Sequence, residues 1–520
     1  MQLIINNWLG GIAPSDRLGK ESSYYGEKAV DPIRKLGYLS PGFRGIKIAQ
    51  SDDTPAVLTK GIHSYTFDPK NIKMYLIENS PEIHQINAVT MAALVDDDPT
   101  TYPHTIGDNL TGHGGHTTFT GEDVIIYPIG ATHYLFYSWN DNTDGDVGRA
   151  ALTGAPGFED DNLSNTVATG AVLTLGVPHR MMEWQENGYL YITNGRYLAE
   201  LDGQTGANGT ADMTAFTLPV GWTAVDIFPA GDLIGICAEY IPGAWTSALT
   251  KRKRTAVFFW DGSSTKWTRK ALLDDPQIVA GRNLEGEYYL FCNDVRAHGV
   301  IRKWNGLSFV KEQELRHNIS GISTKAPLTY SGVCEWRNGF LINDHAGRVY
   351  YYGSIEPGLT KALYHIFESN DVALNAGYAI AALDFAAGSI VASSYDGTNY
   401  HLRRFWEPGD GTYNNTNFLY KSLYYEFPHK IRINYVRLYF NTLLSGADDD
   451  VKIEQDYGNK TTTLGSISYA LDGALEYKRF NKLIKCHNFR VIIDTDGANS
   501  SKGIEYAKIV IDYDFVGDDD

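Results

Sequence analysis

The chain has 520 residues, and its 45 Lys and Arg against 62 Asp and Glu give a formal charge of −17. An apolar fraction of 43% with 21% charged residues excludes general disorder, and the acidic balance disfavours general nucleic-acid binding by the outer surface. The 52 Gly and 34 Tyr, against only 6 Met and 4 Cys, favour tight turns and aromatic strands, so we expect an all-β protein.

The chain carries no run of about 18 apolar residues, and its first seven residues lack the basic and apolar stretches of a signal peptide. We therefore expect synthesis in the cytoplasm without membrane insertion. The cysteines are far apart and form no CxxC pair, which disfavours a zinc site and a disulfide framework.

The first 60 residues are rich in Gly, Ser, Pro and Lys and show no regular strand period. A segment of this composition has too little apolar surface to form a core by itself. We therefore expect residues 1–60 to form an extended arm that lies on its own domain or on a neighbouring subunit.

From residue 61 to residue 410, short apolar strands alternate with Gly/Asn/Asp turns and aromatic strands. The repeats are separated by 44, 56, 51 and 49 residues, as measured between the strand residues Leu190, Ile234, Leu290, Leu341 and Ile390. A period near 50 without helical periodicity is typical of β-propeller blades, and stacked sandwiches are the competing fold. A ring of blades covers both faces of each sheet and leaves no long edges, so we predict a propeller of about seven blades, with six as the alternative.

The blade pattern ends near Trp406, and a Gly/Asn-rich link leads into longer strands of alternating apolar and polar residues. Alternation with period two means that one face of each strand is buried and the other is in water. We predict a separate β-sandwich over residues 417–516, followed by a frayed acidic tail.

Two segments at the ends of the chain resemble a known family. Asn7–Gly19, with Trp8, Gly10 and Gly11, and Gly37–Gly42, which ends in Pro41-Gly42, resemble the start of virion tail proteins of tailed bacteriophages. The strands from Lys421 to Phe440 and from Asp448 to Asp456 are similar to the sandwich that closes such proteins.

The resemblance implies a structural protein of the phage tail, either a propeller-bearing nozzle or a hub-like minor tail protein. Copies would form a homo-oligomeric ring around the channel through which genomic DNA passes without sequence-specific binding, and would contact other tail proteins in the virion. The arm residues Trp8, Gly10, Gly11, Pro41 and Gly42 would then make intersubunit contacts.

The best candidate ion site is the loop Asn140–Asp146, in which Asn140, Asn142 and Asp144 fall at alternate positions before a Gly, as a calcium loop requires. The bidentate Glu at the twelfth position is missing, so a plain hairpin turn rich in Asn and Asp is the favoured interpretation. We expect no cofactor, with calcium as the exception to test.

Other polar motifs have simpler structural explanations. His113 and His116, with His104 nearby, lack a third ligand or a helix to fix them as a metal site. The run Lys251–Arg254 lies between two strands and is most simply a solvated hairpin tip, although it would also suit contact with an acidic neighbour or DNA.

The alternative function is a carbohydrate-binding or glycan-hydrolysing propeller that recognises a host receptor. Trp222, Trp245 and Trp267 would stack on sugars in such a protein, but packing between blades is the favoured explanation for them. Ser394–Thr398 and Trp260–Ser263 approach the Asp-box of sialidase propellers without matching it, and no carboxylate pair, GxSxG elbow, P-loop or HExxH motif is singled out. We therefore expect a structural protein rather than an enzyme.

Overall fold

The computed structural model describes about two thirds of the chain. The described residues are 1–11, 13, 23–28, 30–31, 38–41, 46–47, 59–65, 73–79, 81–87, 104–107, 118–152, 157–163, 172–202, 210–240, 254–315, 327–344, 348–355, 360–368, 380–386, 389–395, 400–405, 419–443, 448–468, 472, 475–495 and 504–516.

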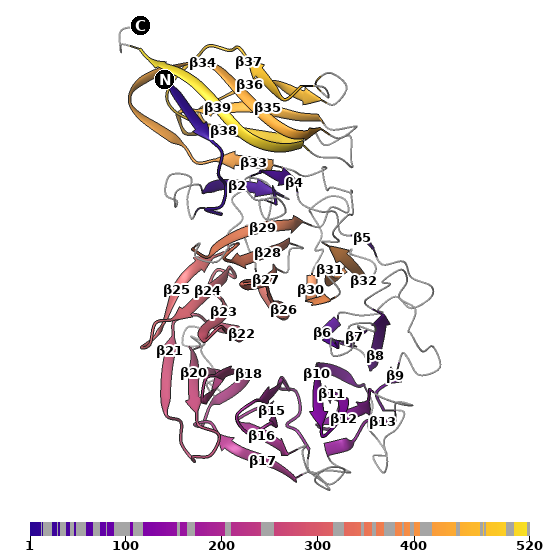
Figure 1. Cartoon of the computed structure of the whole chain (residues 1–520). Coiled ribbons are helices and arrows are strands. Elements are labelled where there is room, and N and C mark those ends of the chain that lie inside the picture. The colour runs from indigo at the N-terminus through magenta and orange to yellow at the C-terminus, as the bar shows by residue number, and fades with distance from the viewer. Residues whose placement is uncertain are drawn as a thin grey trace.

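In the described part of the chain, seven four-stranded antiparallel sheets lie in a ring and form the β-propeller in the lower part of Figure 1. Six of them consist of four consecutive strands. The first three are β6 (Thr59–Tyr65), β7 (Lys73–Glu78), β8 (Glu82–Asn87), β9 (His104–Thr105); β10 (Thr120–Ile129), β11 (Thr132–Asn140), β12 (Gly145–Ala151), β13 (Phe158–Glu159); and β14 (Met181–Trp184), β15 (Tyr189–Asn194), β16 (Tyr197–Asp202), β17 (Thr210–Thr217). The next three are β18 (Trp222–Ala230), β19 (Leu233–Tyr240), β20 (Arg254–Trp260), β21 (Arg269–Leu273); β22 (Gln277–Leu284), β23 (Glu287–Asn293), β24 (Gly299–Trp304), β25 (Phe309–Glu314); and β26 (Leu328–Trp336), β27 (Gly339–Asp344), β28 (Arg348–Gly353), β29 (Ala362–Glu368).

The seventh sheet is completed by the N-terminal segment. Its consecutive strands are β30 (Ile380–Ala386), β31 (Ser389–Tyr395) and β32 (Tyr400–Phe405), and its outer strand is β5 (Ile46–Lys47), which pairs with β32. The innermost strands β6, β10, β14, β18, β22, β26 and β30 contact one another in this order, and β30 contacts β6. The ring is therefore closed by a strand from the start of the chain.

Aromatic and aliphatic side chains fill the spaces between neighbouring sheets, as the alternating strands predict. In one such core, Tyr191 of β15 lies edge-on to Trp260 of β20, with ring centroids 5.9 Å apart. In the next, Phe259 of β20 packs on Trp304 of β24 at 5.3 Å. A ring of sheets thus buries both faces of each blade.

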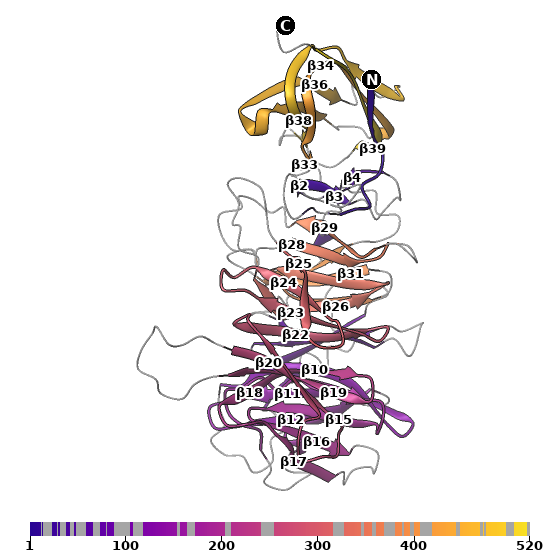
Figure 2. The same ribbon diagram turned by 90° about the vertical axis from the view of Figure 1, so that its left-hand side faces the viewer.

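The terminal domain is a nine-stranded sheet that folds over a single core, and it lies at the rim of the propeller, beyond β29 (Figures 1 and 2). One layer has the order β1-β39-β34-β37, and the other has the order β2-β33-β38-β35-β36; β34 and β38 join them. Its strands are β1 (Gln2–Ile5), β2 (Tyr24–Lys28), β33 (Leu419–Ser422), β34 (Tyr425–Leu443), β35 (Asp448–Gln455), β36 (Lys460–Ser468), β37 (Tyr477–Phe480), β38 (Ile484–Thr495) and β39 (Ile504–Phe515), with the short 3-10 turn η3 (Asp456–Gly458).

The N-terminal segment runs through both domains. Strand β1 pairs with β39, and the Met1 amino group donates a hydrogen bond to the Tyr513 carbonyl at 2.7 Å. Strand β2 pairs with β33, and the two-stranded ladder of β3 (Val30–Asp31) and β4 (Ser40–Pro41) lies between the domains (Figure 2). The segment predicted as an arm therefore supplies strands to the terminal sheet and to the propeller.

The structure confirms the predicted fold class, an all-β propeller with a terminal sandwich. Propeller strands after the arm run from Thr59 to Phe405, and those of the terminal sheet run from Leu419 to Phe515 in addition to β1 and β2. Among the described residues, no helix has the length and apolar character needed to cross a membrane.

Candidate functional site

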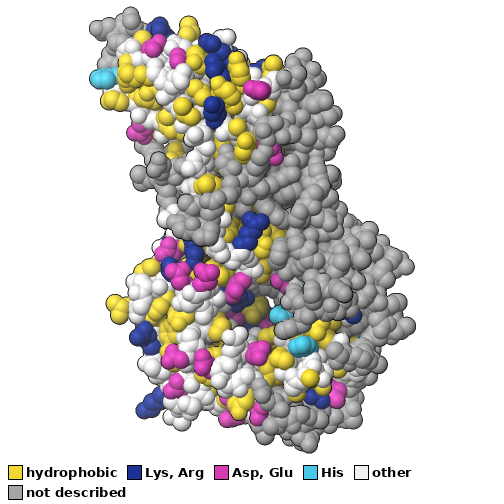
Figure 3. Space-filling view, in the orientation of Figure 1, with side chains coloured by type: hydrophobic (Ala, Val, Ile, Leu, Met, Phe, Trp, Pro, Cys, Tyr) yellow, Lys and Arg dark blue, Asp and Glu magenta, His cyan; other side chains and the backbone are white. Residues whose placement is uncertain are grey.

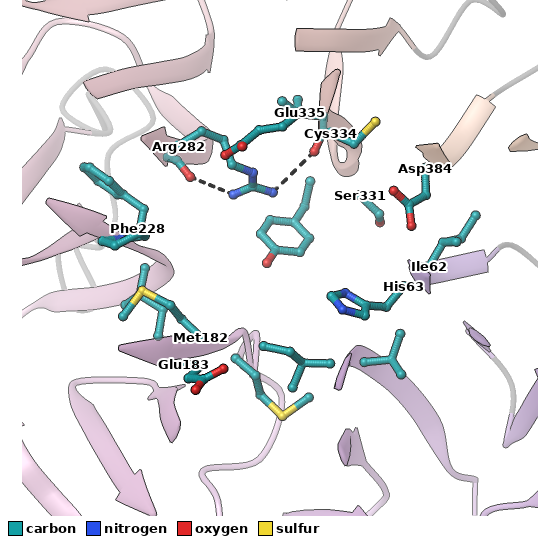
Figure 4. Close-up of a pocket in the computed structure, with 18 of the residues that line it drawn as sticks. Ile62, His63, Met182, Glu183, Phe228, Arg282, Ser331, Cys334, Glu335 and Asp384 are labelled. Atoms are coloured by element: carbon teal, nitrogen blue, oxygen red, sulfur yellow. Dashed lines mark hydrogen bonds between the residues drawn. The ribbon is translucent and has the colours of Figure 1, made fainter. Parts of the chain in front are cut away.

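A cavity of about 690 Å³ lies on the propeller axis, where the innermost strands meet (Figure 4). Its lining combines aliphatic side chains with titratable side chains from the innermost strands β6, β14, β22, β26 and β30. The lining includes Ile62, His63, Ser64, Val124, Ile126, Met181, Met182, Glu183, Ile227, Phe228, Arg282, Tyr330, Ser331, Cys334, Glu335 and Asp384.

A bulge near the start of the innermost strand recurs in six of the seven sheets, and two of these bulges are followed directly by an Asp. The extra residue of a bulge re-aims the next side chain. It directs Asp123 of β10 and Asp226 of β18 toward the following sheet. These two carboxylates have equivalent positions two blades apart.

Each of the two carboxylates binds the backbone of the next blade. Asp123 Oδ2 accepts a hydrogen bond from the Met181 amide at 2.9 Å, and Asp226 Oδ2 accepts one from the Gly281 amide at 2.7 Å. Asp226 also forms an ion pair with Arg282, at 3.1 Å between Oδ2 and Nη1. The axial carboxylates therefore connect neighbouring sheets.

A third carboxylate connects the seventh sheet to the first. The hydroxyl of Ser64 on β6 donates to Asp384 Oδ2 of β30 at 2.6 Å. His63 points into the same side of the cavity (Figure 4), where burial lowers the pKa of its imidazole and the Asp384 charge partly opposes this. Ring closure at this junction thus uses side-chain contacts as well as β5.

Tyr330 crosses the axis because β26 carries a much wider bulge than the other innermost strands. Between Leu328 and Val333 the strand advances five residues while its partner β27 advances only two. The Tyr330 ring lies under the Arg180 guanidinium of the third sheet, 3.6 Å from the ring centroid, and its hydroxyl is 3.5 Å from Asp123 Oδ2 of the second. The Tyr330 side chain therefore reaches across the axis, from the sixth sheet to the second and third.

Burial controls the protonation of the axial groups. It raises the pKa of Asp123 to about 6, and the nearby Arg180 charge opposes the rise. Burial also raises the pKa of Asp226, which Arg282 opposes, and raises that of the Tyr330 hydroxyl well above its usual range. The site thus holds carboxylates that titrate closer to neutral pH than an exposed Asp does.

Glu183 and Glu335 also line the cavity, where Glu183 is half-buried and Glu335 is exposed. Burial raises the pKa of both carboxyls, and Arg282 opposes the rise for Glu335. Figure 4 places Glu335 beside Arg282 and Glu183 across the cavity from it. Carboxyls of this kind can hold a proton for transfer or bind hydroxyl groups of a small polar ligand.

The calcium-loop candidate forms a hairpin turn between β11 and β12. Asn140 Oδ1 accepts a hydrogen bond from the Gly176 amide at 3.1 Å and lies 3.1 Å from His179 Nε2, so it faces another loop. Asp141 Oδ1 accepts bonds from the amides of Thr143 and Asp144, the pattern of an Asx turn. Asn142 is exposed at the tip. Calcium binding at this loop stays a prediction.

His104 lies in a buried cluster and not in an open loop. Its Nε2 is 2.7 Å from Asp160 Oδ1, which also accepts a hydrogen bond from the Tyr137 hydroxyl at 2.6 Å. Its ring stacks on Phe158 with centroids 3.7 Å apart. His113 and His116 lie outside the described residues, as do 251–253 of the basic run; Arg254 begins β20.

Among the described residues, two other side-chain groups have metal-ligating chemistry. Each places three ligand atoms within 4.8 Å of one another, and the groups are Glu78, Glu82, His84 and Asp294, His298, Glu314. In the first, hydrogen bonding to His84 lowers the pKa of Glu82. In the second, Glu314 forms an ion pair with Lys311.

The arm residues contact their own chain. Trp8 is buried in the terminal domain, and its Nε1 donates to the Tyr420 hydroxyl at 3.2 Å. Gly10 accepts a hydrogen bond from Ser23, and Gly11 has φ +68° with no room for a Cβ, which would lie 2.5 Å from the Leu363 carbonyl. Pro41 pairs with Val30 between β4 and β3, and Gly42 lies outside the described residues. Contact with a neighbouring subunit stays a prediction.

The two described candidate tryptophans pack within one blade. The Trp222 and Phe258 ring centroids are 5.3 Å apart, and Trp267, which is 39% exposed, lies edge-on to the same Phe258 ring at 5.4 Å. Trp245 lies outside the described residues. Asp261 of the Trp260–Ser263 turn accepts hydrogen bonds from the Ser263 and Ser264 amides, so it shapes the turn.

No protein-family model matches the sequence, and no curated protein matches it. Among solved structures, the chain is similar to Raptor from Chaetomium thermophilum, at 12% identity and a TM-score of 0.46, over 71% of this chain and 30% of that chain. It is also similar to the Dos1 propeller (9% identity, TM-score 0.41, 70% and 95% covered) and to an exo-beta-1,3-galactanase from Phanerochaete chrysosporium (8%, 0.31, 90% and 99%). The β-propeller itself is established by the strand topology.

Sequence analysis did not single out Asp123, Arg180, Asp226, Arg282 or Tyr330. A weak signal was available, because Asp123 and Asp226 each precede an apolar run at the start of a blade, two periods apart. Nothing in the sequence marks the wide bulge that directs Tyr330 to the axis.

Proposed function

We propose that this protein is a structural component of a bacteriophage tail, in which copies of the chain form a ring around the DNA channel and contact other tail proteins. The phage tail is proposed as the assembly because Asn7–Gly19 and Lys421–Phe440 resemble segments of tail proteins. The observation that supports a structural role is that the axial carboxylates bind neighbouring sheets of the propeller. Among the described residues, Asp123, Asp226 and Asp384 each bind a neighbouring sheet, which serves to hold the propeller rigid.

The arrangement of the domains supports the same role. The N-terminal segment supplies strands to the terminal sheet and to the seventh sheet, so one segment fastens both domains. Because Tyr330 reaches across the propeller axis, a DNA channel has to run between copies of the chain and not through one propeller. In the virion, each propeller would form part of the channel wall or a platform.

The test is the mass of the purified protein in solution, measured by light scattering over a range of concentrations and beside purified virions. We expect a closed oligomer, or incorporation into the particle, at micromolar concentration. A 57.7 kDa species at every concentration that never joins a particle would overturn the proposal.

The second candidate is a glycan-binding or glycan-hydrolysing propeller, which the cavity with Glu183 and Glu335 favours. Carboxyls with raised pKa values on two sides of a cavity are what a sugar-cleaving site needs. A glycan array and a reducing-sugar assay test it, with Glu183→Gln and Glu335→Gln as the variants. Binding or release of sugar that both variants abolish would favour this function over the structural one.

A further inference from the structure

One face of the terminal sheet carries tyrosines interleaved with cations. Because side chains alternate across a strand, the register of β1, β39, β34 and β37 determines which residues share the outward face. Arg437 is opposite Val510 on one side and Arg479 on the other; Tyr439 is opposite Lys508 and Tyr477. We call this the cationic face, and it consists of Tyr435, Arg437, Tyr439, Tyr477, Arg479 and Lys508.

The cations of this face lie on the tyrosine rings. The Arg437 guanidinium is 4.9 Å from the Tyr477 ring centroid, and its Nη1 donates to the Tyr439 hydroxyl at 2.8 Å. Arg479 lies 3.8 Å from the Tyr435 centroid, and Lys508 lies 4.2 Å from that of Tyr439. These contacts hold the charged groups in a fixed array.

One carboxylate shares this face: Asp512 is opposite Tyr435, and it accepts a hydrogen bond from the Asn434 side-chain amide at 2.9 Å. The three cations therefore leave the face with a net positive charge. None of Arg437, Arg479 and Lys508 forms an ion pair with a carboxylate among the residues that the structure describes. Two like charges directly opposite on neighbouring strands are unfavourable in themselves. The face is open to solvent, since Tyr477 is 43% exposed and Ile4 on β1, in the row of Arg437, is 52% exposed. Figure 3 shows dark-blue and yellow side chains side by side on this domain.

The remainder of the chain carries the opposite charge. Residues 59–405, which contain the propeller, hold 25 Lys and Arg against 38 Asp and Glu, whereas residues 419–516 hold 13 of each. The acidic excess therefore lies at one end of the molecule and the cationic face at the other. At physiological salt, attraction between such surfaces acts only at close range, because charges are screened over about 8 Å.

We propose that the cationic face docks on the acidic propeller of a second copy of this chain. Tyrosine and arginine are the residues most enriched at the energetic centres of protein interfaces. A contact between two different surfaces of identical chains is heterologous, and repeated heterologous contacts close into a ring when the rotation allows. The inference rests on the proposed ring and names the surface that forms it.

The experiment reverses charges on the face and measures self-association by sedimentation velocity. We expect Arg437→Glu with Arg479→Glu to raise the dissociation constant of self-association at least tenfold, with each single change giving a smaller shift. The matched control is Lys460→Glu, an exposed cation at the start of β36 in the other layer, which should leave association unchanged. Circular dichroism confirms that each variant is folded.

A cross-linking experiment on the unaltered protein avoids any loss of folding. A zero-length carbodiimide reagent joins amines to carboxylates in contact, and mixing isotope-labelled with unlabelled protein identifies bonds between copies. We expect Lys508 to be linked to propeller carboxylates of the other copy. Intermolecular links that exclude Lys508 would overturn the inference.

The outcomes separate this inference from the proposed ring. If the unaltered protein assembles and the double reversal assembles equally well, the cationic face is not the interface, although the ring stands. If the unaltered protein is a monomer at every concentration and is absent from virions, both the ring and this interface are refuted.

Discussion

Replacing Asp226 tests the role of the axial carboxylates in joining the blades. The carboxylate has no exposed surface, and it accepts hydrogen bonds from the Gly281 amide at 2.7 Å and from Arg282 at 3.1 Å. Asp226→Ala leaves a buried amide and a largely buried guanidinium without this partner. Breaking one side of a buried ion pair costs about 3–5 kcal/mol. Because Arg282 also borders the cavity and is 22% exposed, we expect the lower end of this range, about 3 kcal/mol.

The assay is denaturant unfolding followed by tryptophan fluorescence, which reports on the many propeller tryptophans. Asp232→Ala, an exposed Asp in the β18–β19 turn of the same blade, is the control and should change stability by less than about 0.5 kcal/mol. Adding Arg282→Met to Asp226→Ala removes the unpaired charge and should recover at least half of the loss. The reasoning is refuted if Asp226→Ala is as stable as the control, or if Arg282→Met deepens the loss.

Three further perturbations test other parts of the structure. The pKa of Asp123 is about 6 in the folded protein, above its ordinary value, so the stability that this carboxyl contributes is lost as pH rises from about 4 to about 6. In urea titrations, the stability advantage of the unaltered protein over Asp123→Asn should therefore grow by up to about 3 kcal/mol as pH falls from 7 to 4. A difference that does not change with pH would contradict this. Gly11→Ala places a Cβ 2.5 Å from the Leu363 carbonyl oxygen at a residue with positive φ, so the free energy of unfolding should fall by about 1–3 kcal/mol. Calorimetry should show this as a lower melting temperature. An unchanged melting curve would mean that the arm is not packed against Leu363. Tyr330→Ala enlarges the axial cavity and removes the ring from beneath Arg180, so it should cost about 1–3 kcal/mol in denaturant unfolding. A cost below about 0.5 kcal/mol would show that the ring does not brace the axis.

The regular part of the fold follows from the sequence. Period-two strands separated by Gly and Asn turns at about 50-residue intervals define the sheets, since each blade must bury both faces. The terminal sandwich is marked by its longer alternating strands. Both patterns involve residues close together in the chain, so they can be recognised in the sequence itself.

The features that position the site are not local. Strand β5 has only two residues, Ile46 and Lys47, which is too short for a strand signal, and its partner β32 follows more than 350 residues later. The pairing of β1 with β39 has the same character. Tyr330 reaches the axis through a bulge, and a bulge leaves no trace in a hydrophobic period. The axial site therefore required the three-dimensional structure.

The closure of the seventh sheet by β5 also determines the order in which the molecule can fold as it is made. Ile46 and Lys47 leave the ribosome early, but their partners Arg403 and Arg404 come more than 350 residues later. At bacterial or eukaryotic rates of synthesis this interval lasts on the order of tens of seconds. Throughout that time the residues of β5 lack their partner strand β32, and the first and last of the completed blades each have one face without a neighbouring blade. A nascent chain of this design needs protection from pairing with its neighbours until the last blade has been translated.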